Sequence, residues 1–157
     1  MFDYSLILVD GSVDCDGNAS TSFDEAITTS LVTASGAKVV DLGEGGTPVG
    51  GLAVVMFIPA LASSNDTLVA KIETCDEVAM AGVADYKRTA VMFDIAGVTT
   101  GTILASECTS AVVIVERFAT EKRYVRASLT PAHVDGGTVG NMGKVKVYLT
   151  PFPFVLL

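Results

Sequence analysis

Hydrophobic and polar residues alternate along two segments of the chain, the pattern expected of β-strands with one buried face. The sequence is DTLVAKIET in Asp66–Thr74 and GKVKVYLT in Gly143–Thr150. Successive side chains of a strand point to opposite sides, so each segment has one apolar face. The apolar faces carry Leu68, Ala70 and Ile72, and Val145, Val147 and Leu149. The opposite faces carry Thr67, Val69, Lys71 and Glu73, and Lys144, Lys146 and Tyr148.

Further strand signals are short runs rich in β-branched and aromatic residues, bounded by clusters of Gly, Asn, Ser, Thr or Pro. The run Leu52–Pro59 is apolar throughout, which indicates a buried strand. Helix signals are almost absent. We expect strands at Lys38–Leu42, Leu52–Pro59, Asp66–Thr74, Arg88–Ile95, Ala111–Phe118, Glu121–Thr130 and Gly143–Thr150.

Many short strands separated by turn signals predict an all-β fold. We expect a jelly-roll-like antiparallel β-sandwich of about eight strands. The strand signals dominate residues 36–150, which we take as the sandwich domain. Residues 1–35 are expected to form an N-terminal arm with an acidic loop, and residues 151–157 a short apolar C-terminal tail.

Half of the 157 residues are hydrophobic and only 18% are charged. Such an excess indicates either a membrane span or surface that is hidden against partners. The longest apolar run, Gly51–Ala62, is shorter than the ~20 residues that a spanning helix needs. The N-terminal sequence also lacks the basic start of a secretory signal. We therefore expect contact with partners, no membrane, and a protein that stays where it is made.

The net charge is −8, whereas a nucleic-acid-binding protein is expected to carry a basic stripe. We therefore expect no nucleic acid as a partner. Cys15, Cys75 and Cys108 lie far apart and include no Cys-x-x-Cys pair. An odd, scattered set predicts buried or idle thiols in a reducing compartment rather than a disulfide framework.

Catalytic motifs are missing from the sequence. The single histidine, His133, is expected in a solvated loop, TPAHVDGG. There is no Gly-x-Ser-x-Gly motif, and GEGGTPVGG lacks the Gly-Lys-Ser/Thr ending of a phosphate-binding loop. We expect neither enzymatic activity nor a cofactor.

An acidic stretch, DCDGNASTSFDE at Asp14–Glu25, resembles a calcium-binding loop. Asp14, Asp16, Asn18 and Glu25 match its ligand positions, but Ala19 stands where the loop needs Gly for a sharp turn. Neither flank predicts the helix of a helix–loop–helix site. Two interpretations remain open: an exposed acidic turn, or a cation site of another geometry.

Two features could contact partners. The tail Pro151–Leu157, PFPFVLL, either packs on its own core or docks against a neighbouring subunit. Four cations either flank Glu116 and Glu121 as solvated strand ends or form a small basic patch for an acidic partner. These cations are Arg117, Lys122, Arg123 and Arg126.

An ordered series of segments resembles the small cement, or decoration, proteins of tailed-bacteriophage capsids. The resemblance covers roughly residues 1–150, and the segments VDLGEGG and FATEKRYVRASLT weigh most in it. The acidic insert and the PFPFVLL tail lie outside the family's pattern. In order, the series contains the apolar Ser5–Val9, then VVDLGEGG, GLAVVMFIPAL, SSNDTLVAKIETCDE, RFATEKRYVRASLT and GKVKVYLT.

The resemblance implies a non-catalytic jelly roll that binds the major capsid protein on the outer surface of the virion. It would be made in the bacterial host's cytoplasm and would clamp adjacent capsomers. It also implies a homo-oligomer, a dimer on local two-fold axes or alternatively a trimer. We expect the termini to contact neighbours. The hypothetical contact residues are Phe2, Tyr4, Phe152, Phe154, Leu156, Arg123 and Arg126.

A second class of function stays open, because β-sandwiches also serve as glycan-binding modules for adhesion. Glycan sites usually present aromatic faces. This chain has no Trp, seven Phe and four Tyr, and several of these lie in predicted core strands. The aromatic composition therefore favours the capsid interpretation over the glycan-binding one.

Overall fold

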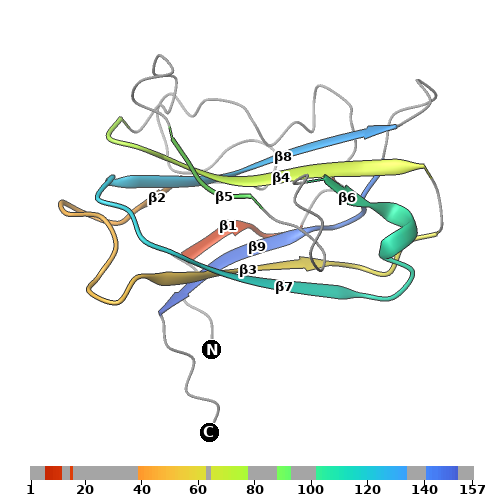
Figure 1. Cartoon of the computed structure of the whole chain (residues 1–157), viewed down its shortest axis with the longest axis horizontal. Coiled ribbons are helices and arrows are strands. Elements are labelled where there is room, and N and C mark those ends of the chain that lie inside the picture. Colours follow the sequence, from red (N-terminus) through yellow and green to blue (C-terminus); the bar gives the residue numbers. More distant parts are fainter. Residues whose placement is uncertain are drawn as a thin grey trace, which may run out of the picture.

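The computed structural model describes residues 6–11, 15, 39–62, 65–77, 88–92, 102–133 and 141–151. These parts form an antiparallel β-sandwich of two sheets (Figure 1), which confirms the predicted fold class. One sheet has four strands in the order β1 (Ile7–Val9), β9 (Lys146–Pro151), β3 (Leu52–Ile58) and β7 (Val112–Phe118).

The other sheet has five strands. Its order is β2 (Val40–Asp41), β8 (Tyr124–His133), β4 (Asp66–Cys75) and β5 (Arg88–Met92), and β6 (Thr102–Leu104) also pairs with β4. A short 3₁₀ helix, η3 (Ala105–Glu107), follows β6. In the described parts of the chain, no helix is long and apolar enough to cross a membrane.

Strand pairing is nested along the chain. β1 pairs with β9, β2 with β8, β3 with β7, and β4 with both β5 and β6. The chain thus resembles a long hairpin, with its bend after β4, that is rolled into two layers. Pairing of β3 with β9 and of β4 with β8 completes the two sheets. This order is that of a jelly roll, which packs antiparallel strands in two sheets.

The core lies between the two sheets and contains the apolar faces that strand alternation predicts. Leu68, Ala70 and Ile72 are fully buried, and so are Val147 and Leu149. Burying one such Leu, Ile or Val side chain contributes roughly 1.5–3 kcal/mol. The alternation predicted for both segments is therefore confirmed, and these faces hold the sheets together.

Every predicted strand segment overlaps one strand of the structure, but two further strands were not expected. β1 lies in the range expected to be an arm, and β6 has only three residues. β8 also continues through Pro131 to His133, where a loop was predicted. In the described structure β2 pairs with β8 only at Tyr124 and Val125, so Pro131 has a sheet neighbour only in β4. Proline is tolerated where one side of a strand is an edge.

The loop between β2 and β3 packs closely against the connection between β7 and β8. Gly46 has a φ of +73°, and a Cβ atom there would lie 2.1 Å from the carbonyl oxygen of Thr120. The backbone N–H of Thr47 donates to the same oxygen at 2.8 Å. The two segments that weigh most in the sequence resemblance are therefore neighbours in space.

Candidate interaction face

The outer surface of the sheet β1–β9–β3–β7 is unusually apolar. Leu52, Val54, Met56 and Ile58 of β3 belong to the core, so Ala53, Val55 and Phe57 point to the outer side. Strand register places apolar residues beside Val55 on both neighbouring strands. The resulting row across the sheet consists of Ile7, Tyr148, Val55 and Val115.

A second row lies beside the first and consists of Lys146, Phe57 and Val113. On the edge strand β7, Val113 is 60% exposed and Val115 is 49% exposed. A solvated sheet face normally carries polar residues at such positions. Val55, between these valines and β9, is only 4% exposed, so the exposed apolar surface of the two rows lies mainly at Val113 and Val115. We call these two rows the interaction face, because exposed apolar side chains gathered on one sheet are typical of binding sites.

The end of this face near β1 is hollowed into a groove of about 380 Å³. Apolar side chains make up most of its lining. The lysine stem of Lys146 crosses over Gly11, where a Cβ atom would lie 2.8 Å from the lysine Cγ. The residues that line the groove are Ile7, Val9, Asp10, Phe57, Lys146 and Tyr148.

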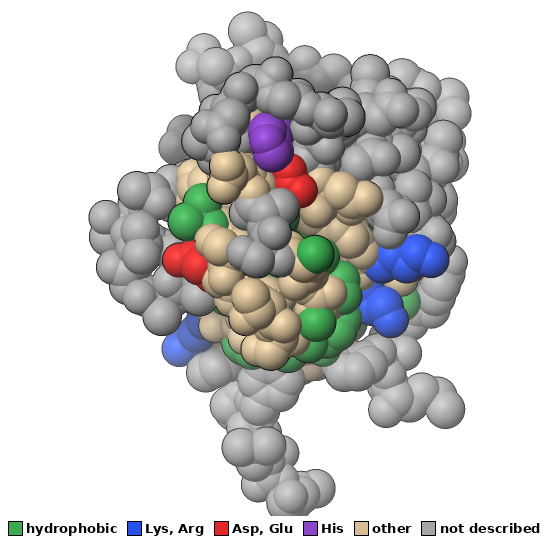
Figure 2. All heavy atoms as spheres, turned by 90° about the vertical axis from the view of Figure 1, so that its right-hand side faces the viewer, with side chains coloured by type: hydrophobic (Ala, Val, Ile, Leu, Met, Phe, Trp, Pro, Cys, Tyr) green, Lys and Arg blue, Asp and Glu red, His purple; other side chains and the backbone are tan. Residues whose placement is uncertain are grey.

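Figure 2 views the molecule from the right-hand side of Figure 1, so the sheet β1–β9–β3–β7 lies in its lower half. Hydrophobic side chains gather in this lower half, and basic side chains lie on either side of them. This view looks along the strands, so it shows the end of the sandwich and the rim of this sheet.

The outer side of the opposite sheet carries a buried ion pair instead. Glu73 of β4 and Arg126 of β8 are register partners and are 1% and 4% exposed. The guanidinium Nε and Nη2 atoms lie 2.8 and 2.7 Å from Glu73 Oε2, and Lys71 Nζ lies 3.1 Å from Oε1. Burial alone raises the pKa of Glu73, but the hydrogen bonds and charges of Arg126 and Lys71 outweigh it and lower that pKa.

A small apolar cluster adjoins the ion pair. Cys75 is the register partner of Tyr124. Each lies two residues from the ion-pair residue of its own strand, and therefore on the same side of the sheet. Both side chains pack with Val39, and Val39 and Cys75 are buried. The outer side of this sheet is therefore covered at Cys75 as well as at the ion pair.

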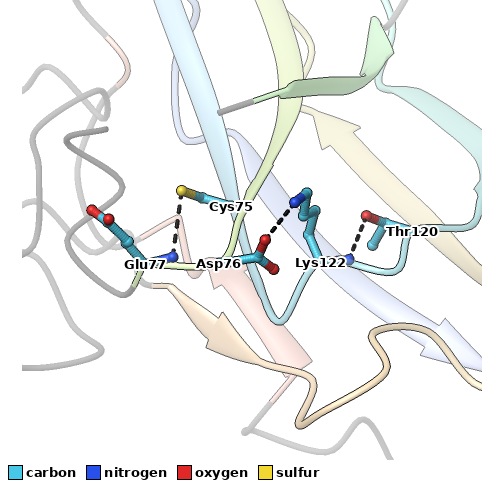
Figure 3. A network of polar contacts seen from close by, with 5 residues as sticks. All are labelled: Cys75, Asp76, Glu77, Thr120 and Lys122. Atoms are coloured by element: carbon cyan, nitrogen blue, oxygen red, sulfur yellow. Dashed lines mark hydrogen bonds and ion pairs between the residues drawn. The ribbon is translucent and has the colours of Figure 1, made fainter. Parts of the chain in front are cut away.

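The four basic residues of the predicted patch all bind groups of their own chain. Arg117 donates to the carbonyl of Gly50, and Lys122 pairs with Asp76 (Figure 3). Arg123 forms two hydrogen bonds of 2.9 and 2.8 Å with Asp41. Among the described residues, acidic partners of these cations are Asp41, Glu73 and Asp76, all of which lie far from them in the sequence.

This pairing affects the hypothesis that Arg123 and Arg126 contact a partner. Arg126 is almost completely buried in the ion pair, so its side chain has little surface to offer a partner, and its contact with a partner stays a prediction. Arg123 keeps part of its side chain exposed and also lies over the ring of Tyr124. Hydrogen bonding by Arg123 lowers the pKa of Asp41, and the same contact raises the pKa of Arg123. Arg123, directly before β8, is therefore mainly a link to Asp41 at the end of β2.

The single histidine is not in a solvated loop. His133 is the last residue of β8, and its Nδ1 atom lies 2.7 Å from Asp66 Oδ1 at the start of β4. Both side chains are partly buried. This pair therefore closes one end of the β4–β8 ladder.

The cysteines are all free and buried, as the sequence predicts. Burial, with a smaller effect of Glu107, raises the pKa of the Cys108 thiol.

In the described residues, no group of three or more His, Cys, Asp and Glu side chains is arranged to hold a metal ion. The candidate cation ligands Asp14, Asp16, Asn18 and Glu25 lie outside the described residues.

Cys15 is the one described residue of the acidic stretch. It is fully buried, and its backbone N–H donates to the carbonyl of Gly143 at 2.7 Å. The backbone N–H of Met142 donates in turn to the carbonyl of Cys15 at 2.8 Å. At this position, therefore, the stretch is part of the sandwich rather than an exposed turn.

The terminal contact residues Phe2, Tyr4, Phe152, Phe154 and Leu156 also lie outside the described residues. The interaction face, in contrast, was missed in the sequence. Its signal was present, because LAVVMFI is apolar on both sides of a strand that has only one core to face.

Comparisons with protein-family models, with curated proteins and with solved structures find no match to the chain.

Proposed function

We propose that this chain is a structural virion protein, a cement or decoration protein of a tailed-bacteriophage capsid. It would bind the outer surface of the shell and clamp adjacent subunits of the major capsid protein. The observation that carries the proposal is the interaction face, whose exposed valines Val113 and Val115 suit contact with another protein. Jelly rolls occur in viral capsid domains, but also in lectins, so the fold alone does not decide.

The interaction face suits a clamp for an energetic reason. A protein that binds only the assembled shell stabilises that shell by mass action. Each contact can be modest, because many copies bind to a symmetric lattice and one copy bridges two capsid subunits. An apolar contact of this kind needs no chemistry at the site. The sequence resemblance to phage cement proteins supports the same role.

A glycan-binding module is the alternative, and the groove gives it one specific argument. Phe57 and Tyr148 place aromatic rings beside the charged Asp10 and Lys146. Sugars bind where an aromatic face lies next to polar groups. A glycan-array screen of the isolated protein tests this alternative. Binding of a defined glycan that is lost in Tyr148→Ala would favour it over the capsid role.

Quantitative binding to capsids tests the main proposal. Particles from the source that lack this protein are incubated with the wild-type chain or with Val113→Lys/Val115→Lys, and occupancy is measured by electron microscopy. We expect the wild type to decorate the outer surface at a defined symmetry position. We expect the double variant to lose most of its occupancy, because charge on the face prevents its burial.

Val49→Lys is the matched control, because Val49 is fully exposed on the β2–β3 loop and belongs to neither row of the interaction face. Its occupancy should equal that of the wild type. If the wild-type chain does not bind any capsid surface, the cement role is wrong. If Val113→Lys/Val115→Lys binds as well as Val49→Lys, the interaction face is not the contact.

A further inference from the structure

The strand β7 forms one edge of the sheet β1–β9–β3–β7 and, in the described structure, pairs only with β3. We propose that the β7 strands of two copies of this chain pair antiparallel, so that their sheets continue into one. A second strand satisfies the backbone N–H and C=O groups that an edge strand leaves unpaired. This inference concerns self-association of the isolated protein, and it does not rest on capsid binding.

β7 lacks the features that usually protect an edge strand from pairing with another chain. Such features are short length, a bulge, proline or lysine. Among the other described edge strands, β1, β2 and β6 have only three, two and three residues, and the register of β5 with β4 shifts between Ile72 and Glu73. β7, in contrast, has seven residues and includes neither proline nor lysine. Its register with β3 has no shift along its length.

The exposed apolar side chains of the sheet lie on this edge. Val55 of β3 has Val115 on one side and Tyr148 on the other, and it is 4% exposed. Val115 has a neighbouring strand on one side only within the described sheet, and it is 49% exposed. A strand beside β7 therefore gives Val113 and Val115 the second cross-strand neighbour that Val55 already has.

Two-fold symmetry restricts how two β7 strands can pair. The axis is perpendicular to the sheet, so the outer sides of both copies face the same way. An axis at Ile114 then places Ile114 opposite its own copy and Val113 of one copy opposite Val115 of the other. Directly opposite side chains are in contact in an antiparallel pair. The exposed valines of both copies therefore form one apolar patch on the outer side of the joined sheet.

The charges of β7 favour this register. The strand has one anion and one cation, Glu116 and Arg117, so two copies bring no net charge to the contact. With the axis at Ile114, no two like charges lie opposite each other. An axis at Glu116 places two carboxylates opposite each other, which is destabilising. An axis at Val115 places Glu116 opposite Ile114, which belongs to the core.

Sedimentation equilibrium on the purified full chain tests the pairing. Two strand edges form a small contact, so we expect a wild-type dimer with a dissociation constant of about 1–100 μM. Val113→Lys/Val115→Lys places like charges opposite each other and should weaken self-association by about tenfold or more. Val113→Glu/Val115→Glu should weaken it similarly. Val49→Lys should associate like the wild type, and circular dichroism establishes that every variant is folded.

A mixture of the lysine and glutamate variants gives the decisive result. In a mixed dimer with the axis at Ile114, each lysine lies opposite a glutamate, which is favourable. We therefore expect the mixture to associate more strongly than either variant alone. A wild type that stays monomeric at about 1 mM, a lysine variant that dimerises like the wild type, or a mixture without recovery would each overturn the proposal.

Disulfide formation tests the register. Val113→Cys mixed with Val115→Cys should cross-link about tenfold faster than either variant alone, because only directly opposite Cβ atoms approach the distance that a disulfide needs. The native cysteines are buried, and Val49→Cys measures cross-linking by random collision. Equal rates for the mixture and for Val49→Cys would contradict the pairing. Neither experiment uses capsids, so failure of strand pairing leaves the cement role standing, and failure of capsid binding leaves strand pairing standing.

Discussion

The outer sides of the two sheets reverse the usual relation between residue type and exposure. On the sheet β1–β9–β3–β7, Val113 and Val115 are exposed to solvent. On the other sheet, the charged Glu73 and Arg126 are almost completely buried. Both sheets have ordinary apolar inner faces, so the difference concerns only their outer sides.

This contrast separates two kinds of constraint on a surface residue. The buried ion pair is part of the fold, because each charge depends on the other for the contacts that water would otherwise provide. The exposed valines contribute little to the isolated chain and are available to a partner. Substitutions on the two sides should therefore affect different measurements: folding on one side and association on the other.

The largest expected effect follows from breaking the ion pair. Glu73→Leu leaves Arg126 buried without its main partner, and we expect a loss of about 3–5 kcal/mol in the free energy of unfolding. Glu73→Leu/Arg126→Met removes both charges and should recover most of that loss. Urea unfolding of the wild type and both variants measures the difference. Equal losses in the single and double variants would show that burial of the two side chains, and not their pairing, determines what they contribute to the free energy of unfolding.

The next effect concerns the loop that connects the two sheets. Gly46→Ala should destabilise the protein by about 2–4 kcal/mol, from positive-φ strain together with overlap of Cβ and the Thr120 carbonyl. Gly43→Ala is the matched control, since its φ is +83° and no atom lies within 4 Å of the added Cβ. It should cost only about 1 kcal/mol. Thermal unfolding compares the two, and similar costs would mean that the loop moves away from Thr120 easily.

A third effect is the response of the ion pair to acid. The folded pKa of Glu73 is below its ordinary value of 4.5, so its contribution is complete above that value. As the pH falls through the lower folded pKa, the carboxylate is protonated and the contribution is lost. The wild type should therefore lose more stability between pH 5 and the acid limit, about pH 2, than Glu73→Leu/Arg126→Met. Parallel stability curves of the two proteins would contradict a paired, ionised Glu73.

The smallest effect on folding is expected on the interaction face. Val113→Lys/Val115→Lys should change the free energy of unfolding by no more than about 0.5 kcal/mol per site, because both side chains are largely exposed. The same substitutions should strongly reduce association with the partner. Urea unfolding together with a binding assay measures both. A large loss of stability would mean that the valines serve the fold, and the contrast between the two outer sides would disappear.

Much of the sandwich was predictable from local pattern. The alternation in Asp66–Thr74 assigned Leu68 to the core and Lys71 to the opposite side, and the structure agrees. β1 and β6 escaped prediction because three residues give too short a pattern to separate from a loop. β8 was predicted too short because Pro131 reads as a strand end unless the strand is known to be an edge there.

The candidate site was predictable only in part. The apolar run LAVVMFI indicated a buried strand, but not that Phe57 would line a groove on the outer side. Arg126 was assigned to the surface because it lies among charged neighbours in the sequence. Its actual partner, Glu73, lies 53 residues away and becomes adjacent only through the register of β4 and β8.

The sequence by itself determined most of the strands, the residues that share each face and the absence of recognisable catalytic motifs. These properties follow from side-chain alternation and local composition, which act over a few residues. The tertiary structure decided which outer side is covered, where the groove lies and which charges pair. Those outcomes depend on nested pairing between distant strands, in which the position of one strand fixes the surroundings of another. A residue's type therefore indicated whether its side chain favours burial or exposure. The packing of the two sheets decided whether it is buried or exposed.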